Sequence, residues 1–566
     1  MYIKEMRVFG FKRFSKLQVE FSPGINIVVG DNDAGKSTLL EAITAVLDGQ
    51  YRGTSLARNL SEDLFNAENV ATYIKNIRSG TQCEPPEILI EAVFCGNDQE
   101  KLLALYEGDA NSKGAKESGI SLRITLDTDS FANEYQEFVD SRECFGIPIE
   151  YYSCSWTTFA RKSIRPVGIK FNASLIGGGH AFAWANAKAV VSRIARNVLE
   201  PSDQIVISQA HRQMRSNFST NEKVQQINDK ISEKVESLTR KTVTLGFEAD
   251  TVSSWENGIV TKLENIPFSN VGDGTKSIIT AELALSKSKD GQKDVILLEE
   301  PENHLSHTRL SMFLDDVKNR CKDIQLIVTT HSSFVANKLD LKNLILLNGN
   351  ESTSFADLQK DTSRFFMKAP GYSTLRVLLC KASILVEGDA DELVVQRAYL
   401  DSYGRLPIQD GIDVISVRGV TFLRFLEIAR KIEKDTVVIT DNDGSVEALR
   451  SKYRDYPFIN SPEATNAHQV ISYDEGYLTE GKAKKVNYNT LESEIYESAG
   501  AEKLAKILGR STNNRNETLD YMEKHKTEVA LKIFDATEKI TYPNYIVKAI
   551  EWAARKVGAK KVGVGK

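Results

Sequence analysis

The chain has 566 residues, 41% of them hydrophobic and 26% charged, which is typical of a globular protein and excludes a disordered or fibrous one. This length predicts roughly three to four domain-sized units. The formal net charge is −5, from 72 basic and 77 acidic residues. Such a balance excludes a protein that grips DNA over its whole surface, whereas local basic patches and clustered carboxylates stay compatible with it.

Cysteine usage and hydropathy indicate the compartment. The six cysteines form no CxxC pair and have no histidine at zinc spacing, so we expect reduced thiols. The N-terminus, MYIKEMRVFGFKRF, lacks the apolar segment of a signal peptide. No run approaches the ~18–20 apolar residues that span a bilayer. We therefore expect a cytoplasmic protein that does not associate with membranes.

The first part of the chain predicts a strand, a second strand, a glycine loop and a helix. Residues 19–21 and 25–29 are short β-rich runs, and residues 37–47 have helical apolar spacing. Residues 171–245 are polar and helical in pattern, with no visible chemistry, which favours a helical insertion or dimerisation arm. Further β-rich runs lie at 85–95, 294–298 and 324–329.

A second α/β series begins near residue 380. Short β-branched runs at 383–386, 413–417 and 436–440 alternate with helical patterns, which predicts a parallel sheet. The polar stretch 349–375 breaks the pattern and marks a boundary. The predicted domains are therefore residues 1–170 with 246–348, the insertion, and residues 376–566.

A phosphate-binding loop stands out in the first part. Residues 30–37 (GDNDAGKS) match GxxxxGK[ST] between an apolar strand and a helix. Glycines such as Gly35 permit the tight backbone that turns N–H groups toward a phosphate, and the helix N-terminus adds its positive dipole. We expect Lys36 to reach the β- and γ-phosphates and Ser37 to ligate Mg²⁺. Asn32 and Thr38 complete the expected ATP site.

Two later strands end in residues suited to nucleotide hydrolysis. Residues 294–305 (DVILLEEPENHL) place Glu299 near the expected Mg²⁺ and Glu300 where it can orient the attacking water. About thirty residues later, the strand in LIVTTHS delivers His331. A lone histidine after a strand is usually structural, but its spacing from the paired glutamates favours a place at the same site.

Acidic residues also follow two strands of the second series. Glu387 and Asp391 lie in VEGDAD, and Asp441 and Asp443 lie in TDNDG. In a regular strand Asp441 and Asp443 point to one face, and ligands bind at the carboxyl ends of parallel strands. Hard oxygen ligands of this kind suit Mg²⁺ or Mn²⁺. Alone, the DND string is more often a plain turn; its pairing with the EGxxD string reverses that preference.

Together these motifs resemble known families. The glycine loop, the glutamate pair and the histidine resemble ABC-type ATPase heads of the SMC and RecF kind, and the acidic motifs resemble the Toprim domain. Their fusion is similar to the OLD (overcoming lysogenization defect) family, which includes Gabija-like nucleases. The resemblance implies an α/β fold: an ABC-type P-loop head with a helical insertion, followed by a Rossmann-like Toprim domain.

The resemblance also implies residue roles. Glu300 would be the catalytic glutamate and His331 the switch histidine. Glu492 would join the metal ligands, and Lys526 would act in cleavage. The aspartate that usually ends this strand is Glu299 here, and the signature loop begins with Gly272 in place of serine; we therefore expect ATP binding but slow hydrolysis.

The expected function is an ATP-binding, metal-dependent DNA endonuclease, regulated by nucleotide and acting in antiphage defence. The implied partners are DNA, further copies of the chain in a dimer or larger oligomer, and a defence-system protein such as a helicase or reverse transcriptase. Three alternatives remain: an SMC-like clamp or sensor with a non-catalytic Toprim scaffold, a topoisomerase or primase-type enzyme, and an ATPase subunit of a transporter. The last is disfavoured by the C-terminal half of the chain.

Overall fold

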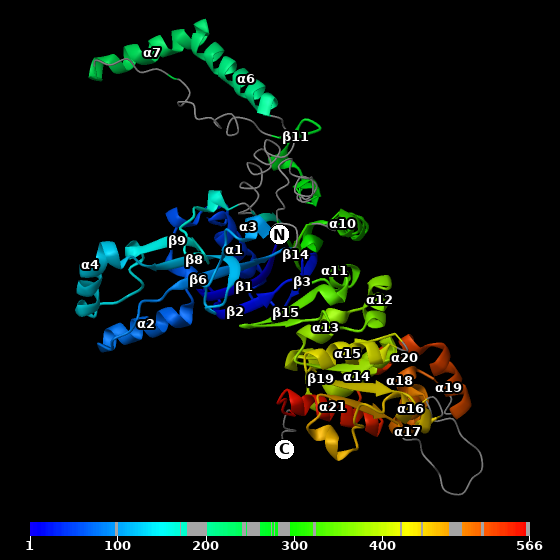
Figure 1. The fold of residues 1–566 in the computed structure, drawn as a ribbon. Coiled ribbons are helices and arrows are strands. Elements are labelled where there is room, and N and C mark those ends of the chain that lie inside the picture. Colours follow the sequence, from blue (N-terminus) through cyan, green and yellow to red (C-terminus); the bar gives the residue numbers. More distant parts are fainter. Residues whose placement is uncertain are drawn as a thin grey trace. The chain divides into compact units, whose positions relative to one another are not determined.

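The chain divides into two compact units, residues 1–330 with 347–352 and residues 331–346 with 353–566. Figure 1 shows the elements of both units in a computed structural model. The structure describes residues 1–96, 100–169, 171, 173–177, 201–239, 245, 261–272, 274–276, 278–280, 295–320, 324–418, 421–442, 445–474, 490–510 and 514–561.

An antiparallel sheet opens the first unit. Its strand order is β2-β1-β6-β8-β7, with β9 paired to β8. The strands are β1 (Tyr2–Phe11), β2 (Phe14–Glu20), β6 (Ile88–Cys95), β7 (Glu107–Gly108), β8 (Glu117–Leu126) and β9 (Tyr152–Thr158). Strand β1 escaped the sequence analysis because charged residues occupy buried positions in it and hide its apolar pattern.

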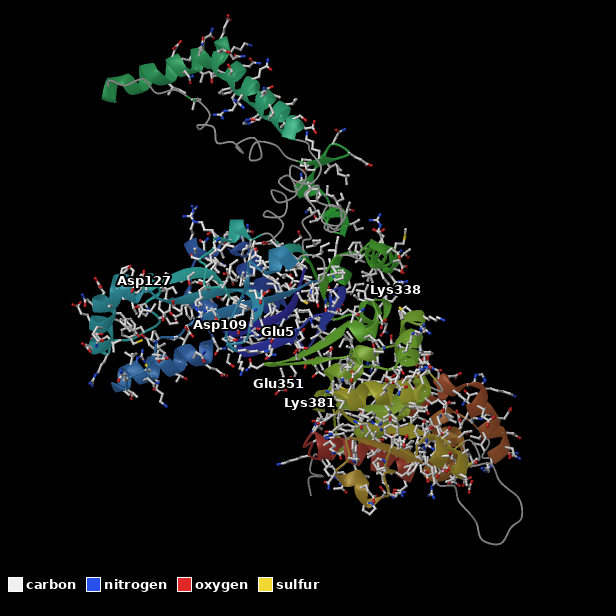
Figure 2. All side chains as sticks on the ribbon, viewed as in Figure 1. Glu5, Asp109, Asp127, Lys338, Glu351 and Lys381 are labelled. Atoms are coloured by element: carbon white, nitrogen blue, oxygen red, sulfur yellow. The ribbon has the colours of Figure 1, made fainter. Side chains whose placement is uncertain are left out.

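An ion-pair network explains those buried charges. Arg7, 1% exposed, donates to Glu5 at 2.8 Å, to Glu91 at 3.4 Å and to Glu117 at 2.7 Å. Lys113 adds a second positive charge 2.9 Å from Glu5, which Figure 2 labels. Buried charges are tolerated only when paired in this way, so the network fixes three neighbouring strands to one another.

A parallel sheet carries the glycine loop. Strands β10 (Ala173–Gly177), β13 (Val295–Glu299), β14 (Leu326–Thr329) and β3 (Ile25–Val29) lie side by side in that order and in parallel register. Helix α1 (Lys36–Asp48) follows β3. Both strand and helix lie within a residue or two of the predicted positions, because their apolar residues are contiguous and the flanking glycines end them.

One side chain, that of Gln325 just before β14, joins this region to the beginning of the first unit. The backbone N–H of Ile3 donates to Oε1 of Gln325 at 2.9 Å, and Nε2 of Gln325 donates to the carbonyls of Ile3 at 2.8 Å and Ser22 at 3.0 Å. Gln325 is 3% exposed, so these bonds satisfy backbone groups that water does not reach.

The helices of the first unit include two in the predicted insertion. These are α6 (Pro201–Thr220) and α7 (Glu222–Thr239), joined at Asn221. The others described at length are α2 (Ala67–Ser79), α4 (Thr128–Ser141) and α10 (His307–Arg320). Much of the insertion, including residues 178–200, lies outside the described residues. Among the described helices, none is both long and apolar enough to cross a bilayer.

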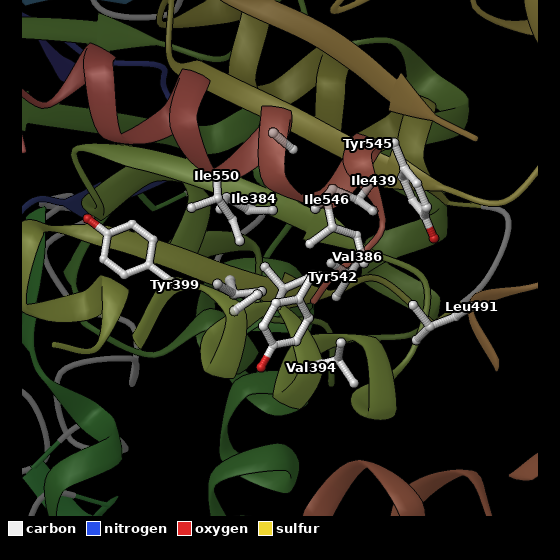
Figure 3. Packing of buried hydrophobic residues seen from close by; sticks show 14 of the residues in the cluster. Ile384, Val386, Val394, Tyr399, Ile439, Leu491, Tyr542, Tyr545, Ile546 and Ile550 are labelled. Carbon is white, nitrogen blue, oxygen red and sulfur yellow. The ribbon is translucent and has the colours of Figure 1, made fainter. Parts of the chain in front are cut away.

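The second unit is built on a parallel sheet of four strands in the order β18-β17-β19-β20. They are β17 (Ala382–Val386), β18 (Ile412–Ser416), β19 (Asp435–Thr440) and β20 (Gln469–Tyr473). Figure 3 shows Ile384 of β17 and Ile439 of β19 packed with Ile546 and Ile550 of one helix. This core holds the carboxyl ends of all four strands along one edge.

Helices surround that sheet. They are α14 (Asp389–Tyr403), α15 (Phe422–Lys431), α16 (Val446–Lys452), α17 (Leu491–Ala499), α18 (Ala501–Leu508), α19 (Arg515–Lys524), α20 (Lys526–Asp535) and α21 (Asn544–Lys556). Helix α20 packs on α14, and α21 packs against β19.

The chain between the two series of parallel strands also forms ordered elements. Strands β15 (Leu344–Asn348) and β16 (Glu351–Ser354) follow β3 in the strand order of the sheet that carries the glycine loop. Helices α11 (Ser333–Lys338), α12 (Lys360–Lys368) and α13 (Thr374–Leu379) belong to the second unit. The predicted boundary at 349–375 left this segment outside both domains, whereas residues 353–375 group with the second unit.

Candidate nucleotide and metal sites

The glycine loop connects β3 to α1 with a backbone that few residues tolerate. Gly35 has φ +96°, and a Cβ atom placed on it would lie 2.4 Å from Cζ of Phe14. A side chain at this position would therefore both strain the backbone and collide with a buried ring. The loop requires glycine here, as a cradle for a phosphate group does.

Lys36 lies folded over that loop. Its Nζ donates to the carbonyls of Gly30 and Asp31, both at 3.0 Å, and the residue is 6% exposed. Burial lowers the pKa of Lys36, although nearby carboxylates, Glu300 first among them, oppose the shift. A buried ammonium bound only to carbonyls is suited to a stronger anionic partner, such as a nucleotide phosphate.

Ser37 and Glu299 meet at the end of β13. The Ser37 hydroxyl donates to Oε1 of Glu299 at 2.5 Å. Burial raises the pKa of Glu299, and the Ser37 hydrogen bond partly offsets this. A hydroxyl and a carboxylate in contact provide two oxygen ligands for the Mg²⁺ of a nucleotide, so these residues fit that ion. Asn32 is exposed and Thr38 half-buried on the same loop and helix.

Glu300 follows directly, in the left-handed region at φ 44°. Its N–H donates to the carbonyl of Thr329 on β14 at 2.9 Å, and its Oε2 accepts from Asn303 at 2.5 Å. This backbone conformation is strained for a residue with a side chain, and such strain is common at functional sites. His331 is exposed and lies two residues after Thr329. The signature loop is described in part, because Asp273 lies outside the described residues.

The acidic residues of the second unit gather at the carboxyl edge of its sheet. Glu387 follows β17 and is exposed, and Asp441 follows β19. Asp391 lies in the first turn of α14, where its Oδ2 accepts from the N–H of Gly388 at 3.0 Å. Glu492 on α17 is 6% exposed. Asp443, predicted beside Asp441, lies outside the described residues.

Crowding of negative charge perturbs this group strongly. Burial raises the pKa of Asp391 to about 6, helped by the charges of Glu387 and Glu492. Burial raises the pKa of Asp441 to about 8, helped by the same two glutamates and Asp391. Oε2 of Glu492 is buried without a hydrogen-bond partner. This group carries more negative charge than one nearby lysine can balance, and a divalent cation would supply further positive charge.

Lys526 provides one positive charge at the same place. Its Nζ lies 2.9 Å from Oε1 of Glu492, and the lysine side chain is 55% exposed. Burial lowers its pKa, but the Glu492 hydrogen bond and the charges of Asp391 and Asp441 outweigh it, so the net pKa is raised. The structure therefore brings Lys526 to the acidic group, and its remaining exposure leaves it accessible to a substrate.

Ligation of a metal stays a prediction. Within the described residues, no three histidine, cysteine or acidic side chains are arranged so that they could hold one ion. The expected set includes Asp443, which that description does not cover. The described residues fit a hard cation in chemistry, because all are carboxylates: the pKa values of Asp391 and Asp441 are raised, and Glu492 has an unsatisfied buried oxygen.

Two further acids were missed by the sequence analysis. Asp474 follows β20 at the same sheet edge, and Glu494 lies on α17 two residues after Glu492. Burial raises the pKa of Glu494, and its hydrogen bond with Asp474 and the charge of Asp441 add to the shift. The rule that acids at strand carboxyl ends mark a site would have found Asp474. Nothing in the sequence alone brings Glu494 to it.

Comparisons with known proteins match both units. Residues 5–365 match the AAA domain family model, and residues 378–443 match the TOPRIM domain model of overcoming lysogenization defect protein-like proteins. The chain is 37% identical over 75 residues, 13% of its length, to a DNA replication and repair protein RecF from Clostridium kluyveri. That match spans one fifth of the RecF protein (20%).

Two solved structures are similar at low identity. The Smc head domain of Pyrococcus furiosus, bound to the C-terminal domain of ScpA, covers 64% of this chain and 99% of its own, with 14% identity and a TM-score of 0.34. The C-terminal region of the Xanthomonas campestris pv. campestris OLD protein covers 32% of this chain and 96% of its own, with 18% identity and a TM-score of 0.25.

Proposed function

Because the chain belongs to the AAA domain family over residues 5–365 and continues into an OLD-like TOPRIM domain over residues 378–443, we propose that it is an ATP-binding, divalent-metal-dependent DNA endonuclease. One observation carries the proposal. Asp391, Asp441 and Glu492, which the sequence separates by up to 101 residues, meet at one sheet edge with Lys526. An acidic group of this kind, poor in positive charge, supports phosphodiester cleavage.

The proposed metal ligands are Glu387, Asp391, Asp441, Asp443 and Glu492. Bound Mg²⁺ or Mn²⁺ would supply a nucleophilic hydroxide at neutral pH and neutralise the scissile phosphate. Lys526 would stabilise the negative charge that develops on the phosphate during cleavage. Its ammonium now pairs with Glu492, and a substrate phosphate would compete for the same donor. Gly388 keeps the first turn of α14 open, because a Cβ there would lie 3.2 Å from Oδ2 of Asp391.

ATP serves as a regulator in this proposal. Phosphodiester hydrolysis is favourable and needs no energy from ATP, so nucleotide acts by stabilising one conformation over another. Lys36 and Ser37 would hold the phosphates and their Mg²⁺, Glu300 would orient water, and His331 would respond to the γ-phosphate. The glycine in place of the signature serine supports slow hydrolysis, which suits a switch.

We further propose that the protein acts as a homodimer or larger oligomer in antiphage defence. ABC-type heads complete their nucleotide sites by facing one another. Helix α6 exposes Ile205 by 56%, Val206 by 63% and Met214 by 54%, which supports an additional contact surface. Sedimentation at micromolar protein with ATP tests the oligomer: a species of 63.1 kDa alone would contradict it.

The activity itself is tested with plasmid DNA. Purified protein is incubated with supercoiled plasmid and Mg²⁺ or Mn²⁺, with and without ATP, and nicked and linear products are quantified. We expect metal-dependent cleavage whose rate changes with ATP. Binding of DNA without cleavage under any metal would favour the alternative, an SMC-like clamp with a TOPRIM scaffold, and a covalent protein–DNA adduct would indicate a topoisomerase.

A further inference from the structure

A set of hydrogen bonds joins helix α11, which begins two residues after His331, to helix α13. Oγ of Ser333 accepts from the N–H of Leu375 at 3.1 Å. Nδ2 of Asn337 donates to the carbonyls of Pro370 at 3.0 Å and Tyr372 at 2.8 Å, and Oδ1 of Asn337 accepts from Thr374 at 2.7 Å. Asn337 and Thr374 are both fully buried (0% exposed), so the two helices cannot shift independently without breaking these bonds.

Arg376 of α13 extends this connection to the acidic edge of the sheet. Its guanidinium holds both carboxylate oxygens of Asp413 on β18, at 2.9 and 2.6 Å. The same group donates to the carbonyl of Val414 at 2.9 Å and to Oε1 of Glu392 at 3.4 Å. The two-point contact with Asp413 fixes the orientation of the guanidinium as well as its position.

Glu392 lies in the first turn of α14, next to Asp391. Its second oxygen, Oε2, accepts from the N–H of Ser416 at the end of β18, at 3.3 Å. Through Glu392 and Asp413, Arg376 therefore bridges α13, β18 and the turn that presents Asp391. All these contacts lie within the second unit.

Helix α11 is connected through the backbone to the nucleotide site, because residues 330–332 lead into it from β14. Thr329 ends β14, accepts from the N–H of Glu300, and pairs in register with Glu299. Thr330 donates its hydroxyl to Glu302 at 2.7 Å, and His331 follows. Glu300 and His331 therefore both lie next to the segment that leads into α11.

We propose that Arg376 is a positioning residue through which nucleotide bound at the glycine loop alters the metal affinity of the acidic edge. In this scheme a nucleotide-dependent shift of residues 330–333 moves α11 and α13 together, and Arg376 transfers the shift to the first turn of α14. The inference rests on the proposed function in one respect, the assignment of Asp391 and its neighbours as metal ligands. A route of this kind has to be demonstrated by coupling, because contact alone does not establish it.

The test measures that coupling directly and does not require cleavage. Mn²⁺ affinity of the full-length protein is measured by calorimetry with and without a saturating non-hydrolysable ATP analogue, and the same titrations of Asp441→Asn identify the Mn²⁺ that binds with the nucleotide and not at the acidic edge. We expect the analogue to change the wild-type Kd for Mn²⁺ by about fivefold or more, the range of ordinary allosteric coupling. Arg376→Gln should reduce this change to less than about twofold while its affinity for the analogue stays within about twofold of wild type. Arg376→Lys, which keeps the charge and loses the two-point contact, should be intermediate.

Arg405, near the other end of α14, provides a matched control. Arg405, just beyond the C-terminal end of α14, also contacts both oxygens of one aspartate, Asp410, at 2.9 and 2.8 Å. Its side chain is 30% exposed, close to the 39% of Arg376. Arg405→Gln should leave the nucleotide effect on Mn²⁺ affinity at the wild-type size.

The outcomes separate this inference from the proposed function. The inference is overturned if the wild type shows no nucleotide effect on Mn²⁺ affinity, if Arg376→Gln keeps the full effect, or if Arg405→Gln loses as much. Should Arg376→Gln fail to fold, Ser333→Ala replaces it, because it removes only the bond to Leu375; an unchanged effect there also counts against the route. If nucleotide changes the Mn²⁺ affinity of the wild type but the protein cuts no DNA, the inference stands and the proposed nuclease function is wrong.

Discussion

Replacement of Asp441 by asparagine should change how the stability of the metal-free protein depends on pH. The carboxyl group is isosteric with the amide, so the substitution removes a charge and little else. In the folded protein burial and three neighbouring acids raise the pKa of Asp441 from 3.8 to about 8. An unfolded chain releases this proton near pH 4.

The sign follows from proton counting. Between about pH 4 and pH 8 the folded protein holds a proton that the unfolded chain has lost, so stability falls as pH rises through this window and levels off above it. Each pKa unit corresponds to about 1.4 kcal/mol, so the shift from 3.8 to about 8 sets an upper limit of about 6 kcal/mol. Asp391 and Glu492 also repel one another, so removal of one charge relieves only part of the repulsion. We therefore expect Asp441→Asn to raise the free energy of unfolding by about 2–3 kcal/mol at pH 8.5 and by much less at pH 4.5.

Hydrogen exchange of β19 peptides in EDTA provides the assay, since the two units need not unfold together. Protection of the wild type should decline from pH 4.5 to 8.5 after correction for intrinsic exchange, and protection of Asp441→Asn should decline less. Added Mn²⁺ should reverse the ranking, because only the wild type gains from the cation. Identical pH dependence in the two proteins would refute the assignment of Asp441 as a buried, repelled carboxyl.

Further predictions concern the two sites separately. Asp441→Ala with Asp443→Ala should abolish plasmid cleavage while ATP binding, measured by fluorescent-nucleotide titration, stays near wild type; normal cutting would disprove the metal site. Lys526→Ala should lower the cleavage rate by about 10²–10³-fold, as removal of one transition-state donor does, with less effect on DNA affinity in gel-shift assays. Lys36→Ala should weaken ATP binding and remove the ATP response, whereas Glu300→Gln should retain unhydrolysed ATP and hold cleavage at its ATP-bound level; if both variants respond like wild type, the head is no switch.

Local motifs made much of the nucleotide site predictable. A glycine loop works through its own backbone, so the spacing of Gly30, Gly35 and Lys36 already predicts the strand, loop and helix that the structure shows. The contact of Lys36 with nucleotide phosphates stays a prediction. The acids at the ends of β17 and β19 were predictable for a related reason, because parallel strands bring their carboxyl ends to one edge whatever lies between them.

What escaped prediction depends on packing between distant segments. The charges of Arg7 and its glutamates conceal β1, since a strand with buried ion pairs does not alternate in hydropathy. The meeting of Glu494 with Asp474, and of Arg376 with Asp413, is set by how helices lie on the sheet. Asp443 and part of the insertion lie outside the described residues, and their predicted roles are untested.

The bonds between Ile3 and Gln325 bear on how the protein is made. During synthesis Ile3 of β1 leaves the ribosome 322 residues before Gln325, whose side chain accepts its backbone hydrogen bond. At roughly 5–20 residues per second, that interval is about 16–64 s. Strand β3 waits almost as long for β14, its parallel neighbour. The nascent first unit therefore exposes the apolar strand β3 during most of its translation. We expect chaperones at the ribosome exit to bind this strand until β14 emerges.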